Sequence, residues 1–473
     1  MTKLNLLGEI APKFAESAHI YRQFLGTFAS SLLSLSGGLT FGFTAVLLPQ
    51  LENDPYYPYD KAYDSWIASI SPLAMVMGCL FSGSMSDGLG RRTGQILLVI
   101  PFTIGWIIMG FANGNTGMLV GRFITGISTG AIRPNSIVYI GEITDPKYRA
   151  IGLFGPTLLL HIGSLMCHTV GKYVYWKTSC FIFALPNLLC VAILLCLMES
   201  PLWLLSKGKI DDGIKSFKLF RGNGEAAEKE LAKVLEKTKD KGEISAFKES
   251  VKLISSKPFI KSLAMIFLLF VAVQWCGINT LTYYAQIIFE KTFAGDIDAY
   301  MLMLSTDGLR IMTAVGMCLI AKIIPRKTFF VSSCFVASVV LVILVVYLYL
   351  KPEGMVWIAV TCIVLYIAVA SALTSIAWTF VAEVFPSKVR GYGSSISSGI
   401  SFALLFISVK ASPEIMFSFG EQAMYASFAV STFISGIILY FIIPDTNGKS
   451  LQDIENEMYK KESDKKTSAS PPV

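Results

Sequence analysis

Long apolar runs recur along this chain, and each is long enough to cross a lipid bilayer as a helix. Spanning about 30 Å of hydrocarbon takes about 20 apolar residues in a helix. Inside hydrocarbon every backbone polar group must bond within its own segment, so runs of this length predict membrane-spanning helices. Twelve runs meet the requirement: 24–48, 65–85, 93–112, 116–141, 150–171, 176–197, 259–290, 298–321, 328–350, 355–382, 391–415 and 421–443.

The composition agrees with this interpretation. Hydrophobic residues make up 53% of the 473 residues, charged residues make up 15%, and the mean hydropathy is +0.59, which excludes a water-soluble protein. The net charge of +7 then indicates loops on the cytoplasmic side of a membrane rather than a nucleic-acid partner. All nine cysteines lie inside apolar runs, so no disulfide framework is expected. We also expect no cofactor and no metal site.

A short pattern of charged residues occurs twice, about half the chain apart. Glu142 ends an apolar run, a link containing Pro and Lys follows, and Arg149 begins the next run. Glu383 and Arg390 repeat this arrangement 241 residues later. Two halves with matching charged loops are typical of a transporter built from two related helix bundles. We therefore predict an all-α integral membrane protein with two bundles of six helices each.

Basic residues are unevenly divided between the loops of the two sides. The short loops at the even-numbered connections carry nine Lys and Arg residues, and those of the other side carry five. Because the cytoplasmic side carries the excess of positive charge, we expect both termini there. The predicted domains are a cytoplasmic segment at 1–23, a first bundle at 24–197, a cytoplasmic linker at 198–258, a second bundle at 259–443 and a cytoplasmic tail at 444–473.

The linker is rich in Lys, Glu and Asp, and its apolar residues recur at helical spacing. This pattern predicts short amphipathic helices on the cytoplasmic face. The apolar positions are Ile210, Ile214 and Phe217, then Leu231 and Leu235, then Ile244, Phe247, Val251 and Ile254.

Short motifs at matching positions make the chain resemble a known family. They are Asp87-x-x-Gly90-Arg91-Arg92, Gly121-Arg122, Tyr139-x-x-Glu142, Glu199-Ser-Pro201, Gln274-x-x-Gly277-Ile-Asn279-x-x-x-Tyr283-Tyr284, Glu383-x-Phe385-Pro386, Arg390-Gly391 and Pro444-Asp445-Thr446-x-Gly448. In this order they resemble the sugar porter family of the major facilitator superfamily, most closely its facilitated trehalose transporters and related facilitative hexose transporters. The resemblance covers nearly the whole chain.

The resemblance implies what the protein does. It implies a carrier, not an enzyme, that moves trehalose or a hexose across the plasma membrane by alternating access. Proton-coupled relatives carry a carboxylate in the first span, whereas this chain has no acidic residue between Arg22 and Glu52, which favours facilitated diffusion. The expected partners are a sugar and the lipid bilayer, with the carrier acting as a monomer.

Charged residues at the predicted cytoplasmic helix ends are candidates for a gate. Carboxylates and guanidinium groups from the two bundles can pair when this side closes and must separate when it opens. The alternative is that they only set topology and cap helices. The candidate gate residues are Asp87, Arg91, Arg92, Glu142, Arg149, Glu383 and Arg390.

A sugar site needs amide or hydroxyl groups for the hydroxyls and an aromatic plate for the ring. Gln274 and Asn279 provide amides beside a helix break at Gly277, and Trp378 provides an aromatic plate. The alternative for Trp378 is ordinary packing, which is the usual role of a tryptophan in an apolar helix. The resemblance extends the candidate substrate-binding residues to Gln274, Asn279, Trp378, Thr157, His161, Arg133, Arg310, Tyr283, Tyr284 and Phe402.

Several of these positions depart from the family pattern and make the predicted cavity basic. Thr157, His161, Ser164 and His168 form one polar stripe, which predicts a helix face turned to protein or water. Arg310 stands where the family has an asparagine, and Arg133 lies in an apolar run. Charges at this depth indicate function by default, but Asp307, one turn before Arg310, offers a structural pairing.

Two other functions stay open. The basic residues favour an anionic or glycosylated small molecule carried on the same fold. Ser375 and Ala377 stand where the family has prolines, which favours a sugar receptor that does not transport. Lys410 resembles a lysine of the trehalose-type relatives and is interpreted as structural.

Overall fold

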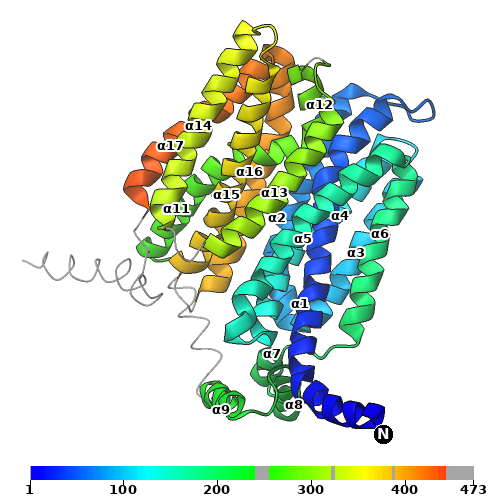
Figure 1. The fold of residues 1–473 in the computed structure, drawn as a ribbon, viewed down its shortest axis with the longest axis vertical. Helices are drawn as coiled ribbons and strands as arrows, with labels where there is room; N and C mark the ends of the chain where they lie inside the picture. Colours follow the sequence, from blue (N-terminus) through cyan, green and yellow to red (C-terminus); the bar gives the residue numbers. More distant parts are fainter. Residues whose placement is uncertain (1, 240–254, 294, 321–324, 386–388, 444–473) are drawn as a thin grey trace, which may run out of the picture.

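The computed structural model describes residues 2–239, 255–293, 295–320, 325–385 and 389–443, and its regular elements there are all helices (Figure 1). The first half contains α1 (Thr2–Glu52), the short helix η1 (Lys61–Tyr63), α2 (Asp64–Leu89), α3 (Arg91–Phe111), α4 (Asn115–Ile143), α5 (Pro146–Tyr173) and α6 (Trp176–Leu195). The linker contains α7 (Pro201–Ser206), α8 (Ile210–Arg221) and α9 (Glu225–Lys239). The second half contains α11 (Lys257–Gln274), α12 (Ile278–Phe293), α13 (Ala299–Ile320), α14 (Arg326–Leu350), α15 (Val356–Val384), α16 (Arg390–Phe419) and α17 (Glu421–Ile442).

Eleven helical stretches among the described residues are long and apolar enough to span a membrane, with α11 and α12 forming one of them. They account for every predicted run except 116–141, which lies in α4, a helix of 29 residues that is also long enough to cross. This helix is less apolar because its polar groups face protein. Arg122 is fully buried and donates to the backbone oxygens of Thr40 and Ile67, at 2.9 and 3.1 Å. The predicted fold class is therefore confirmed, with α4 as the twelfth span.

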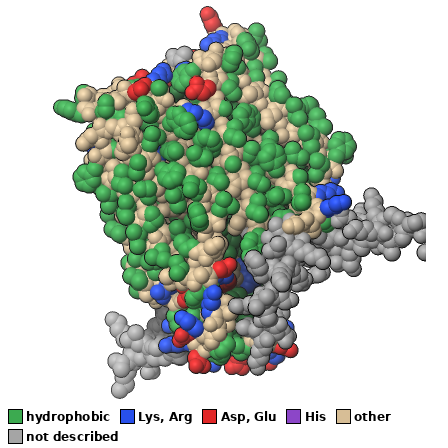
Figure 2. Space-filling model, turned by 180° about the vertical axis from the view of Figure 1, so that it is seen from behind, with side chains coloured by type: hydrophobic (Ala, Val, Ile, Leu, Met, Phe, Trp, Pro, Cys, Tyr) green, Lys and Arg blue, Asp and Glu red, His purple; other side chains and the backbone are tan. Residues whose placement is uncertain are grey.

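The two ends of the molecule differ in what covers them. Helices α7, α8 and α9 and the first turns of α1 lie at one end, here called the linker end, and η1 lies at the other, here called the η1 end (Figure 1). On the face shown in Figure 2, hydrophobic side chains cover most of the surface between these ends, whereas most of the visible Lys, Arg, Asp and Glu lie nearer the ends. This distribution matches a protein that crosses a bilayer.

Local signals set several helix boundaries. Pro146 and Pro201 stand in the first turns of α5 and α7, where a backbone N–H has no hydrogen-bond partner within the helix, so the missing N–H of proline breaks no helical bond. The side chains of Ser200 and Ser256 accept hydrogen bonds from backbone N–H groups at the starts of α7 and α11. The predicted N-terminal segment 1–23 does not form a separate element, because α1 continues from Thr2 through the first span.

Small residues allow close packing within the first half. A Cβ atom added at Gly38 of α1 would collide with the backbone oxygen of Leu160 in α5, and Gly163 faces Gly38 from α5. Without side chains at these positions, the two backbones approach directly, which is how membrane helices gain packing energy. Between the halves, α2 packs along α16, α5 against α13 and α1 against α12.

The linker helices form a small core of their own. Leu205, Phe217 and Leu231 are buried together, and Ile214 and Leu235 pack against them. The spacing predicted all of these positions except Leu205. Ile210 was expected on the same face but is exposed, because it stands at the first residue of α8. The last predicted stretch, at 244–254, lies outside the described residues.

Two polar contacts tie the linker to the first half. Arg221 of α8 contacts Asp145 at 2.9 Å, and the Gln23 amide of α1 donates to Asp145 at 2.8 Å. The same amide donates to the backbone oxygen of Phe220 at 2.6 Å. The linker is therefore bonded to both α1 and the loop between α4 and α5.

Candidate functional site

The predicted helix break is present between α11 and α12. Gly277 has φ of +89°, a left-handed conformation that favours glycine, and a Cβ there would meet the ring of Phe428. A broken helix at membrane depth must satisfy the backbone groups that it frees. The Tyr366 hydroxyl donates to the Cys276 oxygen at 2.5 Å, and Arg310 donates to the Ile278 oxygen at 2.9 Å.

The two predicted amides lie together at this break. The Asn279 side chain donates to the Gln274 side-chain oxygen at 2.7 Å, and Gln274 donates to the hydroxyl of Ser401 at 2.8 Å. Ser401 comes from α16 and was not among the candidates that the sequence indicated. Each carboxamide carries two N–H donors and an oxygen acceptor, so this group, here called the amide cluster, keeps groups that can bond hydroxyls.

Trp378 forms a contact between the two halves. Its ring lies 4.9 Å from that of Phe270, and the guanidinium carbon of Arg133 lies 4.1 Å from the Trp378 ring centre. Arg133 belongs to α4 and Trp378 to α15, so this cation–π contact joins the halves. The Arg133 Nε atom is buried and has no hydrogen-bond partner in the described part of the chain. A sugar ring that stacks on this face of Trp378 must displace Arg133.

Arg310 has partners within the protein. Its guanidinium contacts the Thr282 hydroxyl and donates to the Ile278 oxygen, and its Nη1 lies 3.9 Å from Asp307. The other oxygen of Asp307 contacts His168 of α5. Asp307 therefore lies within ion-pair distance of Arg310, as the structural interpretation expects, and a role of Arg310 in substrate binding stays a prediction.

The remaining predicted substrate-binding residues are not bonded to the amide cluster within the described residues. Tyr283 is fully buried with its ring 5.6 Å from Phe41, and Tyr284 donates to the Val409 oxygen at 3.2 Å. Phe402 is buried in α16, and Thr157 and His161 are half-buried on α5.

The polar stripe on α5 turns toward protein in its second half. The Ser164 hydroxyl donates to the Gly38 oxygen of α1 at 3.1 Å. His168, which the candidate set omitted, meets Asp307 of α13.

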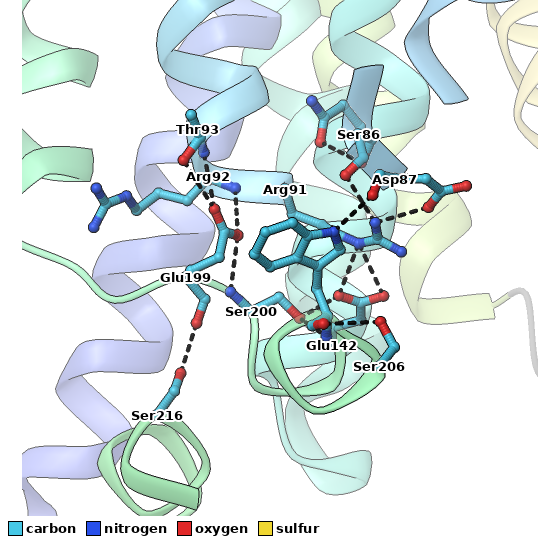
Figure 3. A network of polar contacts seen from close by, with 12 residues as sticks. Ser86, Asp87, Arg91, Arg92, Thr93, Glu142, Glu199, Ser200, Ser206 and Ser216 are labelled. Atoms are coloured by element: carbon cyan, nitrogen blue, oxygen red, sulfur yellow. Dashed lines mark hydrogen bonds and ion pairs between the residues drawn. The ribbon is translucent and has the colours of Figure 1, made fainter. Parts of the chain in front are cut away.

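Charged residues at the linker end form one network (Figure 3). Arg91 contacts Glu142 at 3.2 Å and Asp87 at 2.8 Å, and Glu142 accepts a hydrogen bond from Ser200. The Arg91 and Glu142 side chains are mostly buried, whereas the Asp87 side chain is 74% exposed. The Arg91 pair with Glu142 therefore carries more of the electrostatic energy than the pair with Asp87.

Glu199 extends this network and was not among the predicted gate residues. It accepts hydrogen bonds from the backbone N–H groups of Arg92 and Thr93, at 2.8 and 3.1 Å, and so caps the start of α3. The Arg92 side chain instead donates to the Leu197 backbone oxygen. The Glu199-Ser-Pro201 motif was the available signal, because it precedes an amphipathic segment.

The described part of the network joins the first half to the linker, not the two halves to each other. Arg149 is half-buried, and its Nε has no hydrogen-bond partner among the described residues. The side chains of Glu383 and Arg390 lie outside the described part of the structure. Pairing between the halves at this end stays a prediction.

At the η1 end the halves contact each other directly. Lys410 of α16 donates to the Ser65 hydroxyl of α2 at 2.6 Å and lies 4.2 Å from the ring centre of Trp66. Next to these groups is a cavity of about 280 Å³, lined from both halves and including Asp64 and Glu414. Lys410 therefore has the structural contacts that were expected of it.

Two bundles of six spans, with polar side chains buried at a broken helix and others paired across the two halves, are the architecture of a membrane carrier. The sequence model of the family described as sugar (and other) transporter matches residues 26–458. The chain belongs to this family and is a multi-pass membrane transporter, not an enzyme.

Two relatives are similar along nearly the whole chain. The facilitated trehalose transporter Tret1 of Polypedilum vanderplanki is 27% identical over 452 residues, covering 93% of this chain and 88% of the relative. Tret1 of Bombyx mori is 28% identical over 451 residues, covering 93% of this chain and 87% of the relative.

Solved structures share the fold. The proton:xylose symporter XylE bound to 6-bromo-6-deoxy-D-glucose superposes with a TM-score of 0.74 at 18% identity, covering 91% of this chain and 99% of that one. XylE from E. coli in a partially occluded inward open conformation gives a TM-score of 0.76 at 16% identity, covering 91% and 100%.

Proposed function

We propose that this chain carries a neutral sugar, either trehalose or a hexose, by facilitated diffusion across the plasma membrane. The observation that carries the proposal is the amide cluster of Gln274, Asn279 and Ser401 at the break between α11 and α12. The names of the relatives support the substrate class, since two are facilitated trehalose transporters and one structure holds a glucose derivative. The cluster supplies the donors and acceptors that sugar hydroxyls require.

We further propose that the linker end faces the cytoplasm, with both termini there, and that the carrier acts as a monomer without a nucleic-acid partner. The excess of Lys and Arg in loops of the linker end supports this orientation. Transport then alternates between a state open at the η1 end and a state open at the linker end. The first state requires that the contacts of Lys410 and the packing of α5 on α13 separate.

The purified carrier in proteoliposomes tests this function. Uptake of trehalose, glucose, a second hexose and an anionic glycoside is measured, together with exchange against preloaded sugar. We expect saturable, stereospecific uptake of trehalose or a hexose that never exceeds equilibrium. Binding of sugar without uptake would establish a receptor instead and contradict the proposal.

The same assay tests the site. Gln274→Ala and Asn279→Ala should each weaken apparent affinity several-fold, because a lost hydrogen bond costs about 1 kcal/mol. The matched control is Gln286→Ala, which removes an exposed amide of α12 that bonds only Glu290 of its own helix among the described residues. Site variants with the kinetics of this control would show that the sugar binds elsewhere.

Arg133 favours a second candidate, an anionic or glycosylated substrate. Its guanidinium lies on the Trp378 ring, and no described carboxylate is bonded to it. A carboxylate or phosphate on the substrate would supply that partner. This candidate predicts that the anionic glycoside is carried in preference to glucose and that Arg133→Gln reverses the preference. If glucose or trehalose is preferred and Arg133→Gln leaves the ratio unchanged, the second candidate is wrong.

A further inference from the structure

We propose that His168 and Asp307 form a proton-binding site between the two halves, so that closing the η1 end of the carrier takes up one proton. The inference rests on the proposed function only in requiring that the halves separate during transport. Nothing in the sugar site itself is needed for it.

The geometry makes this contact a link between the halves. His168 is on α5 of the first half, and its Nδ1 meets Oδ2 of Asp307 on α13 of the second half. The exposed fractions of the two side chains are 0% and 3%. The Tyr300 hydroxyl of α13 also donates to the His168 backbone oxygen at 3.2 Å. Because this contact lies between α5 and α13, which pack against each other across the two halves, separating these helices breaks it.

Asp307 depends on His168 for its hydrogen bond. It is the one carboxylate among the buried described residues. Arg310 lies 3.9 Å away, beyond hydrogen-bond distance, because its guanidinium is held by Thr282 and by the Ile278 oxygen. Within the described residues, the imidazole is the group that hydrogen-bonds this carboxylate. A buried carboxylate is stabilised most by a partner that carries positive charge.

Other charged and titratable groups face the pair from each neighbouring helix. The cations are Arg310 on α13, Arg122 on α4 and Lys172 on α5, and His161 on α5 is a further imidazole. Arg122 and Lys172 stay with His168 on the first half when the halves separate, whereas Arg310 moves away together with Asp307. The phenols and thiols are Tyr300 on α13, Tyr366 on α15, Tyr283 and Tyr284 on α12, and Cys167 on α5, and they are neutral near pH 7. From α1 the imidazole meets Gly42, which has no side chain.

The difference between the two states therefore comes from Asp307 and Arg310, which move together, and of these two Asp307 is the one that contacts the imidazole directly. In the closed state the protonated imidazole bonds directly to the carboxylate, in a buried site. In the open state Asp307 keeps Arg310 on its own helix, whereas His168 meets water and the remaining cations. A histidine in water loses its proton near about pH 6.5. Closing takes a proton from the η1 side, and reopening returns it to the same side, so no proton crosses the membrane.

The site is also connected to the amide cluster. Arg310 bonds the Ile278 oxygen, and the next residue, Asn279, bonds Gln274. When His168 leaves, Arg310 remains the cation nearest to Asp307 and is drawn toward it, which loosens its hold on the helix break. Opening of the η1 end therefore loosens the support of the sugar site.

The test measures the conformation without sugar. Spin labels at Tyr173→Cys on α5 and Met301→Cys on α13, both exposed at the η1 end, report the distance between the helices. The more accessible native cysteines, Cys196 and Cys318, are replaced by serine. From about pH 8 to about pH 5 the closed fraction should rise, with the closed-to-open ratio changing by at most about tenfold per pH unit for one proton. An unchanged distance distribution in the parent would overturn the proposal.

Variants identify the residue. The chain has three histidines, so His168→Gln should remove the pH response while His19→Gln, at the linker end beside Gly222, keeps it. Asp307→Asn, which keeps a hydrogen-bonding partner but removes the charge, should also remove it. A response lost in His161→Gln and kept in His168→Gln would contradict the assignment. If the distance responds to pH but no sugar is carried, the proton site stands and the proposed function fails.

Discussion

Two buried arginines of this carrier are stabilised in different ways. Arg122 donates to backbone oxygens of Thr40 and Ile67 and to the Thr44 hydroxyl, all neutral acceptors. Arg310 also has neutral acceptors, but Asp307 lies close enough to balance its charge. Removing Arg122 therefore leaves only neutral acceptors behind. Removing Arg310 instead leaves Asp307 as a buried carboxylate with a weaker counter-charge.

Arg310→Asn should destabilise the protein by about 3–5 kcal/mol, because it leaves Asp307 buried with less compensation. The double variant with Asp307→Asn should recover part of this loss, since neither charge of this pair then remains. Thermal unfolding of the detergent-solubilised parent, the two single variants and the double variant measures the coupling free energy between the two side chains. Losses that simply add would show that the two side chains do not interact.

Among the elements, close contact between α1 and α5 organises the first half. Gly38 and Gly163 let the backbones meet, and α4 fits among α1, α2, α3 and α5 although it carries two arginines. In lipid such packing supplies the association energy that apolar burial supplies in water. A methyl group added at the contact should therefore destabilise the protein by more than the better helix propensity of alanine stabilises it.

Gly38→Ala should lower stability by about 1–3 kcal/mol, because its Cβ collides with the Leu160 backbone oxygen and forces the helices apart. Gly316→Ala of α13 is the matched control, since a Cβ there meets nothing within 4 Å. It should be neutral or stabilising by up to about 1 kcal/mol, from the better helix propensity of alanine. Unfolding curves of both variants make the comparison, and equal effects would rule out close packing as the cause.

For the whole molecule, the described contacts hold the two halves together at the η1 end and in the middle of the interface. Lys410 with Ser65 and Trp66 belongs to the end, and Arg133 with Trp378 and His168 with Asp307 belong to the interior. The described charges of the linker end pair within the first half and the linker. The equilibrium between the two open states therefore depends on a small number of contacts.

Lys410→Gln should increase the population open at the η1 end several-fold, because the cation–π contact and one hydrogen bond are together worth about 1–2 kcal/mol. The spin-label pair on α5 and α13 measures this population. Lys177→Gln is the control, because Lys177 lies at the same end but bonds Asn113 inside the first half. A shift of equal size in both variants would mean that general surface charge, not this contact, sets the equilibrium.

Local pattern was sufficient for most of the architecture. The length of the apolar runs determined the spans, since the thickness of the bilayer fixes the length of a helix that crosses it. Gly277 determined the break, because glycine tolerates the left-handed conformation found there. The periodic apolar residues predicted Phe217 and Leu231 of the linker core, but not Leu205, which precedes the periodic stretch.

Contacts between distant segments were decided only by the tertiary structure. Ser401 is 127 residues from Gln274, Asp307 is 139 residues from His168, and Glu199 is 107 residues from Arg92. Nothing in local sequence specifies which faces of two helices meet, because that depends on how all the spans pack together. The sequence therefore determined which polar groups are present inside the membrane, and the packing of the two halves decided which of them are partners.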